Sequence, residues 1–159
     1  VYILRKMLLS FRPEVYEKIK SGQKIFEHRR NFPDESVMAY MYVSSPVKAI
    51  TGIVYLGKRH CLSDWLEKFK DDSDAVTRIK EYIETYHYRY AMEIEKFQET
   101  SQIALDDLRE NVPGFVAPQM YIYLDNTELL EYIDSNLKVA NLQVKHLFER
   151  IEACQVCVH

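Results

Sequence analysis

The sequence predicts an α+β fold in which a small mixed or closed sheet is surrounded by helices. Five or six short strands and several helices follow one another in an irregular order, whereas a doubly wound parallel sheet requires their regular alternation. The length of 159 residues fits a single domain, and no linker rich in Gly or Ser divides the chain. One folded unit is therefore expected.

The first predicted elements are a strand, a helix and a second strand. Residues 7–12 predict a short strand that a proline ends. That proline suits the first turn of a helix over residues 13–21, and Gly22 occupies the position of a helix C-cap. Residues 24–30 alternate between two faces, which predicts the second strand.

The middle of the chain predicts two more strands and a helical segment. Residues 37–43 and 48–56 are rich in β-branched and aromatic side chains, which favours strands. Residues 62–85 carry two apolar stripes at helical spacing. Between the stripes, residues 71–74 are Asp and Ser, typical N-cap residues, so a capping loop is expected there.

The last third predicts two strands and two helices. Residues 87–97 change to a period of two, which indicates a strand, and residues 105–110 predict one short helix. Residues 116–124 predict a closing strand. Apolar positions over residues 127–153 fit helical spacing, so a C-terminal helical extension is expected.

The charge is distributed unevenly along the chain. The net charge is −3, which argues against a protein coated in cations. Residues 1–60 carry 11 Lys and Arg against 5 Asp and Glu, whereas residues 61–159 carry 10 against 19. This asymmetry predicts one localised basic surface, although a chance distribution of solvated charge is an equal alternative.

Several classes of function are disfavoured by the residues present. Three cysteines, an odd number, fit free thiols in a reducing compartment, and we expect a cytoplasmic protein without a membrane span. Cys154 and Cys157, with His159, form only half of a zinc pattern, so no metal is expected. The scattered glycines form no phosphate loop, and no cofactor is expected.

The richest motif is G-x-K-x-x-E-x-R, which spans residues 22–29. Gly22 allows the helix to end sharply, and Lys24 then stands at the mouth of the next strand. Glu27 and Arg29 are two residues apart on one strand face, so they can pair with each other or reach one ligand together. The alternative is an ordinary solvent-facing ion pair on an edge strand.

This motif, together with residues 7–14 before it, resembles the ASCH domain, which belongs to the PUA-like superfamily of small β-barrels. Residues 42–50 resemble the next two strands of that family, and residues 117–119 followed by Tyr121 resemble its closing strand. The likeness covers about residues 7–125.

The resemblance implies a PUA-like mixed β-barrel domain over residues 1–125, with a helical insertion at about 62–85. Residues 126–159 are expected to form a helical extension packed on the same domain. The resemblance also implies a cleft that binds RNA or a modified nucleotide, in a regulatory or coactivator-like role, with DNA not expected as a partner. The candidate binding residues are Arg12, Gly22, Lys24, Glu27, Arg29, Arg30, Ser44, Ser45 and Gln119.

Two other functions stay open. One branch of the ASCH family removes the acetyl group of N4-acetylcytidine with a lysine at the Lys24 position. If this chain is such an enzyme, Lys24 and Glu27 are the candidate catalytic residues. Lys24 would stabilise the oxyanion and Glu27 would activate water. That branch has a threonine near the Glu27 position and a distant glutamate, for which Glu93 or Glu95 is a candidate here. The third possibility is an interaction scaffold that uses the helices from Thr127 onward.

Four of the twelve tyrosines cluster at residues 82–90. Exposed aromatic side chains can stack on nucleic-acid bases. Half-buried tyrosines on strands are commoner than such platforms, so core packing is the favoured interpretation of this cluster.

Overall fold

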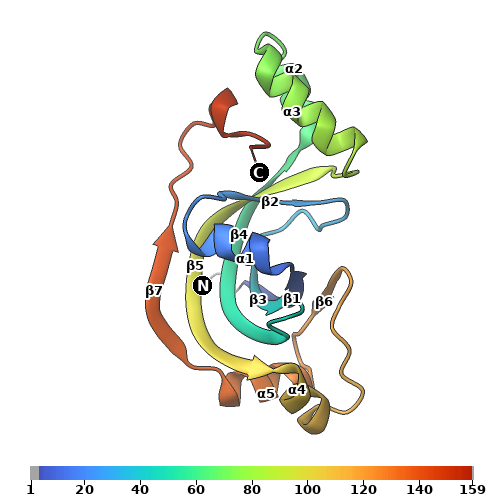
Figure 1. The fold of residues 1–159 in the computed structure, drawn as a ribbon, viewed down its shortest axis with the longest axis vertical. Helices are drawn as coiled ribbons and strands as arrows, with labels where there is room; N and C mark the ends of the chain where they lie inside the picture. The colour runs from blue at the N-terminus through green and yellow to red at the C-terminus, as the bar shows by residue number, and fades with distance from the viewer. Residues whose placement is uncertain (1–3, 159) are drawn as a thin grey trace.

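The computed structural model describes residues 4–158, and its main feature is one curled sheet of seven strands (Figure 1). The strands are β1 (Arg5–Phe11), β2 (Phe26–Arg29), β3 (Val37–Val43), β4 (Ala49–Cys61), β5 (Tyr90–Ala104), β6 (Tyr121–Tyr123) and β7 (Val139–Lys145). The helices are α1 (Pro13–Lys20), α2 (Leu62–Lys68), α3 (Ser73–Glu84), α4 (Leu105–Asn111), α5 (Glu128–Asn136) and the short 3₁₀ helix η1 (Ala153–Gln155).

The strand order is β2-β5-β4-β3-β1-β6, and β7 pairs with β5. β1 runs parallel to β3, and the other pairs are antiparallel. The long strands β4 and β5 shift register three times along their ladder, and such bulges bend strands. Figure 1 shows the result, a half-barrel that curls around α1. The predicted α+β class with a mixed, barrel-like sheet is confirmed.

Both faces of the central strands are covered, which explains their almost continuous apolar sequences. Leu9, Met41 and Phe97 lie in the core on the concave face, where α1 contributes Tyr16 and Ile19. On the convex face, Leu8, Tyr40 and Ile50 pack with residues of α4 and α5.

Gly52 of β4 allows α1 to sit close to the sheet. A Cβ atom at this position would lie 2.9 Å from a ring atom of Phe97 and 3.3 Å from a ring atom of Tyr16. The Tyr16 hydroxyl also donates to the Thr51 carbonyl at 3.2 Å. Glycine therefore permits the contact that seats α1 over β4.

The expected helical segment of residues 62–85 consists of two helices, α2 and α3, which lie at one end of the molecule (Figure 1). Asp72 of the predicted capping loop accepts a hydrogen bond from the Ala75 amide at 3.0 Å, as an N-cap residue does. The two helices form a separate core with Phe26 and the C-terminal segment around Cys157.

The helix expected over residues 127–153 is wrong beyond Asn136, where α5 ends. Residues 139–145 form β7 instead, because the edge of β5 offers unpaired backbone groups there. The Gln98 side chain strengthens this edge by donating to the carbonyls of Ala140 and Leu142 at 2.8 and 3.3 Å. Residues 126–158 therefore contain one helix, one strand and a 3₁₀ turn, and both α5 and β7 are joined to the body of the sheet.

The lengths of several strands also differ from the sequence prediction, and one of these is β4, which continues past residue 56 to Cys61. β5 runs from Tyr90 to Ala104, well past residue 97, because it pairs with β4 over its whole length. The closing strand β6 is limited to Tyr121–Tyr123, which pair with β1.

Candidate functional site

A cavity of about 260 Å³ opens where α1, the end of β1 and β2 meet. Four cationic side chains and two carboxylates line it, so the motif of residues 22–29 and the start of α1 contribute most of its polar surface. The lining residues are Ser10, Phe11, Arg12, Glu14, Val15, Lys18, Lys24, Glu27, His28, Arg29 and Tyr88.

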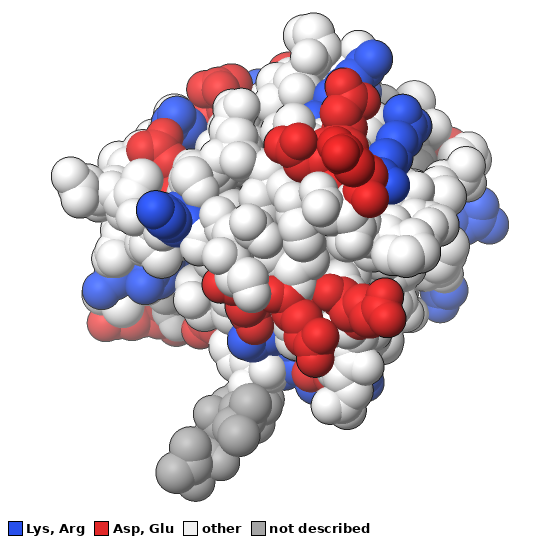
Figure 2. All heavy atoms as spheres, turned by 90° about the horizontal axis from the view of Figure 1, so that it is seen from below, with Lys and Arg blue, Asp and Glu red and all other residues white. Residues whose placement is uncertain are grey.

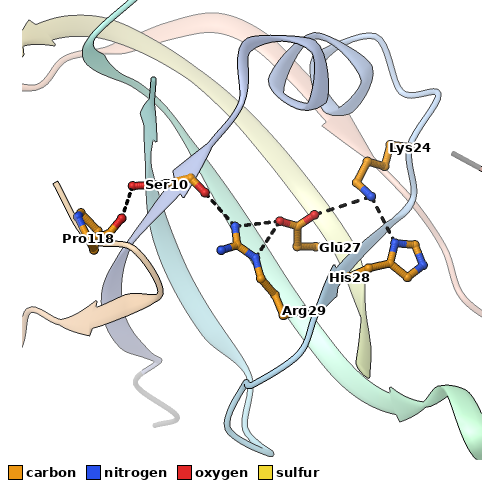
Figure 3. Close-up of polar contacts among 6 residues, drawn as sticks. All are labelled: Ser10, Lys24, Glu27, His28, Arg29 and Pro118. Carbon is orange, nitrogen blue, oxygen red and sulfur yellow. Dashed lines mark hydrogen bonds and ion pairs between the residues drawn. The ribbon is translucent and has the colours of Figure 1, made fainter. Parts of the chain in front are cut away.

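Glu27 lies at the centre of this site and pairs with Arg29 (Figure 3). The Nε and Nη2 atoms of Arg29 both donate to Glu27 Oε2, at 3.0 and 2.9 Å. Nη2 also donates to the Ser10 carbonyl at 2.9 Å, which ties β2 to the end of β1. The predicted pairing of Glu27 with Arg29 is confirmed, but the pair is buried rather than solvent-facing, because Glu27 is only 5% exposed.

Lys24 approaches the same carboxylate from the other side. Its Nζ atom is 3.6 Å from Glu27 Oε1 and 3.2 Å from His28 Nδ1 (Figure 3). Lys24 is only 6% exposed, and this burial lowers the pKa of its ammonium group below the ordinary value, while Glu27 opposes the shift. One buried carboxylate thus holds two cations in place.

Both cations keep donors for a ligand. A protonated lysine has three N–H groups, and contacts to Glu27 and His28 account for two of them. The Nη1 atom of Arg29 has no hydrogen-bond partner within the described part of the chain, and Arg29 lines the cavity. The arrangement can therefore bind an anionic or carbonyl oxygen with preorganised, charge-assisted hydrogen bonds.

The structure brings together four of the predicted binding residues, Arg12, Lys24, Glu27 and Arg29. Arg12 lies at the rim, where its side chain is 69% exposed and its Nε atom is 3.4 Å from Glu14.

The other five predicted residues do not line the cavity. Gly22, with a φ of +83°, ends the α1 region as expected, and its neighbours are side chains of the β7 edge. Arg30 and Gln119 are exposed. Ser44 and Ser45 lie in the turn after β3, where the Ser44 amide donates to the Phe11 carbonyl at 2.9 Å.

Sequence reasoning did not predict seven of the eleven lining residues, and His28, Tyr88 and Ser10 are three of these. Strand alternation predicts that His28 lies on the face opposite Glu27. In the structure, β2 begins only at Phe26, so Lys24 precedes the strand and its side chain can contact His28. Tyr88 reaches the cavity from the connection between α3 and β5, since β5 pairs with β2 from Tyr90 onward. Ser10 supplies a backbone carbonyl, and no side-chain pattern signals that role.

The two glutamates considered as distant catalytic partners lie elsewhere. The Glu93 carboxylate pairs with His60 Nε2 at 2.7 Å, and Glu95 lies against Gly57. Neither lines the cavity.

The described residues contain no group of three or more His, Cys, Asp or Glu side chains that could hold a metal ion. Cys157 is buried, which raises the pKa of its thiol to about 12. His159 of the expected half-pattern lies outside the described residues. No helix within residues 4–158 has the length and apolar character to span a bilayer.

No family model matches the chain, but known proteins are similar to it in sequence and in structure. The ASCH domain-containing ribonuclease of Zymomonas mobilis subsp. mobilis is 26% identical over 142 residues, which cover 85% of this chain and 95% of that protein. The crystal structure of ASCH from Zymomonas mobilis aligns with a TM-score of 0.65 and 24% identity, over 84% of this chain and 96% of that one. A crystal structure of a serine-to-alanine mutant of that protein gives the same TM-score and identity.

The sequence relative and the shared fold point in the same direction as the motif of residues 22–29, which lines the cavity. The matched region extends over most of both chains, and its curled mixed sheet is the fold shared with the crystal structure of ASCH from Zymomonas mobilis. The sequence similarity, the common fold and the motif of residues 22–29 all support the resemblance of this chain to the ASCH domain.

Proposed function

We propose that the chain binds single-stranded RNA and that one nucleotide occupies the cavity at Lys24, Glu27 and Arg29. The observation that carries this proposal is the buried carboxylate that orients two cations while leaving N–H groups of both available to a ligand. A relative named as a ribonuclease supports RNA as the partner. The cavity is small, so it suits a base or phosphate of one nucleotide and not a duplex groove.

The distribution of charge supports a local site and not a broad binding face. Figure 2 views the molecule from the end that carries α4 and α5, and acidic side chains gather near the middle of that face. These two helices contain six acidic residues, Asp106, Asp107, Glu110, Glu128, Glu131 and Asp134. Phosphates are repelled there, so RNA is expected to approach from the cavity side.

The test is an affinity measurement with a labelled single-stranded RNA octamer of random sequence, read by fluorescence anisotropy. Lys24→Met removes one donor and keeps the side-chain volume, while Arg29 still pairs with Glu27. We expect about 10- to 100-fold weaker binding, because a hydrogen bond to a charged group contributes about 1.5–3 kcal/mol.

Lys138→Met is the matched control, because it makes the same substitution at an exposed lysine that does not line the cavity. It should bind like the wild type. Equal affinities of Lys24→Met and the wild type, with both proteins folded, would contradict the proposal.

RNA cleavage is a second candidate, favoured by the contact between Lys24 and His28. A lysine whose pKa is lowered by burial can exchange a proton with a ligand, and His28 is 3.2 Å from its Nζ atom. Incubation of end-labelled RNA with the wild type and with Lys24→Met tests this candidate. Cleavage that is lost in Lys24→Met supports it, and intact RNA after prolonged incubation at high protein concentration contradicts it.

Deacylation of N4-acetylcytidine would use the same cavity but is less well supported by the geometry. Glu27 accepts two hydrogen bonds from Arg29 and contacts Lys24, so most of its lone pairs are engaged and few remain to activate water. Mass spectrometry of N4-acetylcytidine incubated with the protein tests this reaction. Release of acetate would make deacylation the main function, in place of RNA binding.

A further inference from the structure

A second, larger hollow lies beside the cavity at Lys24. Its volume is about 440 Å³, and its lining includes Arg78, Tyr82 and Tyr86. Arg12 and Tyr88 line both hollows. The two hollows therefore meet at Arg12 and Tyr88.

A row of aromatic rings leads from the first hollow into the second. The rings of His28 and Tyr88 have centroids 5.9 Å apart and planes inclined by 33°, and Tyr88 and Tyr86 follow at 5.8 Å and 29°. Successive planes in the row are thus tilted by only about 30° from each other. Tyr86 ends the row and is 52% exposed, a large aromatic surface that faces solvent.

Core packing explains only part of this tyrosine cluster. Tyr82 is 6% exposed and meets His28 and Tyr86 edge-to-face, so it supports the row from behind. Tyr86 buries little of its ring and contributes little to a core. The turn that carries it is well defined, since His87 has a left-handed φ of +60° and the Tyr88 amide donates to the Tyr82 carbonyl at 3.1 Å.

Of the charged groups around the second hollow, Arg12 is the cation available to a ligand, and it lies where the two hollows meet. Among residues 4–158, Arg12 forms its one ion pair with the exposed Glu14, so its guanidinium can reach a phosphate. Arg78 is committed to the protein, because it donates to two backbone carbonyls of residues 153–156. Glu81 also lines the hollow. Its negative charge repels phosphate, so the part of the hollow away from Arg12 favours a neutral base.

We propose that this second hollow is a nucleotide subsite in which a base stacks on Tyr86. Arg12 then contacts the phosphate that joins this nucleotide to the one in the Lys24 cavity. The inference rests on the proposed RNA-binding function and specifies its ligand. The ligand is a single strand of at least two nucleotides, not a free nucleoside.

The experiment compares two probes on the same variants. The first is a fluorescein-labelled RNA hexamer of random sequence, and the second is an equimolar mixture of the four nucleoside 5′-monophosphates, measured by competition. We expect Tyr86→Ala to bind the hexamer about 5- to 100-fold more weakly, since stacking on an aromatic side chain contributes about 1–3 kcal/mol per base. The inhibition constant of the monophosphates should not change.

Tyr86→Phe is the matched control, because it keeps the ring and should bind the hexamer like the wild type. A hexamer affinity of Tyr86→Ala within twofold of the wild type would overturn the subsite, as would an equal loss for both probes. Lys24→Met separates this inference from the proposed function, because it should weaken both probes. Failure of Lys24→Met to weaken either probe, or no binding of either probe by the wild type, overturns the proposed function and the subsite with it.

Discussion

At the scale of single residues, Glu27 holds the site together. Its carboxylate is buried and contacts both Arg29 and Lys24. Burial of a charge is costly unless it is paired, so each of the three residues depends on the others. The same pairing keeps the two cations in fixed positions before a ligand arrives.

Glu27→Gln is therefore expected to destabilise the protein, because it leaves two cations without their counter-charge. Removal of one partner of a buried pair costs about 3–5 kcal/mol. Urea denaturation measures the loss. Glu14→Gln makes the same change at a carboxylate that is 59% exposed, and it should alter the free energy of unfolding by less than about 0.5 kcal/mol. Equal stabilities of the two variants would contradict the account of Glu27.

The lowered pKa of Lys24 predicts a pH dependence with a definite sign. In a window below the ordinary lysine pKa of 10.5, the unfolded chain retains a proton that the folded chain has lost. The free energy of unfolding therefore rises with pH in that window, whereas affinity for an anionic phosphate falls. Stability and RNA affinity measured from neutral to alkaline pH, for the wild type and Lys24→Met, test this behaviour. The prediction is wrong if Lys24→Met shows the same two profiles as the wild type.

At the scale of elements, the seat of α1 on β4 positions the cavity, because α1 supplies Val15 and Lys18 to its wall. Tyr16 packs edge-to-face on Phe97 at 5.7 Å, directly over Gly52. A change at this contact should therefore affect both the core and the site.

Gly52→Ala is expected to destabilise the fold by about 1–3 kcal/mol, since the added Cβ would lie 2.9 Å from the buried Phe97 ring. Thermal denaturation checks the loss. Gly57→Ala in the same strand is the control, because the three atoms nearest to its Cβ would all belong to the flexible, exposed Glu95 side chain. Comparable losses in both variants would show that the strand itself, and not the seat of α1, needs glycine.

Local sequence signals predicted the elements that depend on near neighbours. The helix end at Gly22, the capping role of Asp72 and the pairing of Glu27 with Arg29 all arise within a few residues. β7 could not be predicted, because its apolar spacing fits a helix and only the open edge of β5 makes it a strand. Tyr88 was missed for a similar reason, since pairing of β5 with β2 brings it to the cavity.

At the scale of the whole molecule, acidic side chains gather on the end with α4 and α5 (Figure 2), whereas cationic side chains outnumber carboxylates around the cavity. The uneven charge of the two halves of the sequence predicted a localised basic surface, and four cationic side chains do line the cavity. RNA is therefore expected to contact few phosphates.

A shallow dependence of RNA affinity on salt follows from this distribution. Neutralisation of one phosphate on a single strand contributes a slope of about −0.7 in a plot of log K against log salt. Two or three contacts through Arg12, Lys24 and Arg29 predict a slope of about −2. Anisotropy titrations between low and physiological salt measure it. A slope steeper than about −4 would indicate a broad cationic face and would contradict the local site.

The most direct test of the central claim is an NMR titration of the ¹⁵N-labelled protein with a single-stranded RNA hexamer, following the Nε–H signals of the arginine side chains. We predict that the Arg29 signal shifts and saturates, because its guanidinium lines the cavity, while the signal of Arg109 on α4 stays in place. A saturable shift of Arg109 with Arg29 unchanged would place the RNA elsewhere and contradict the account.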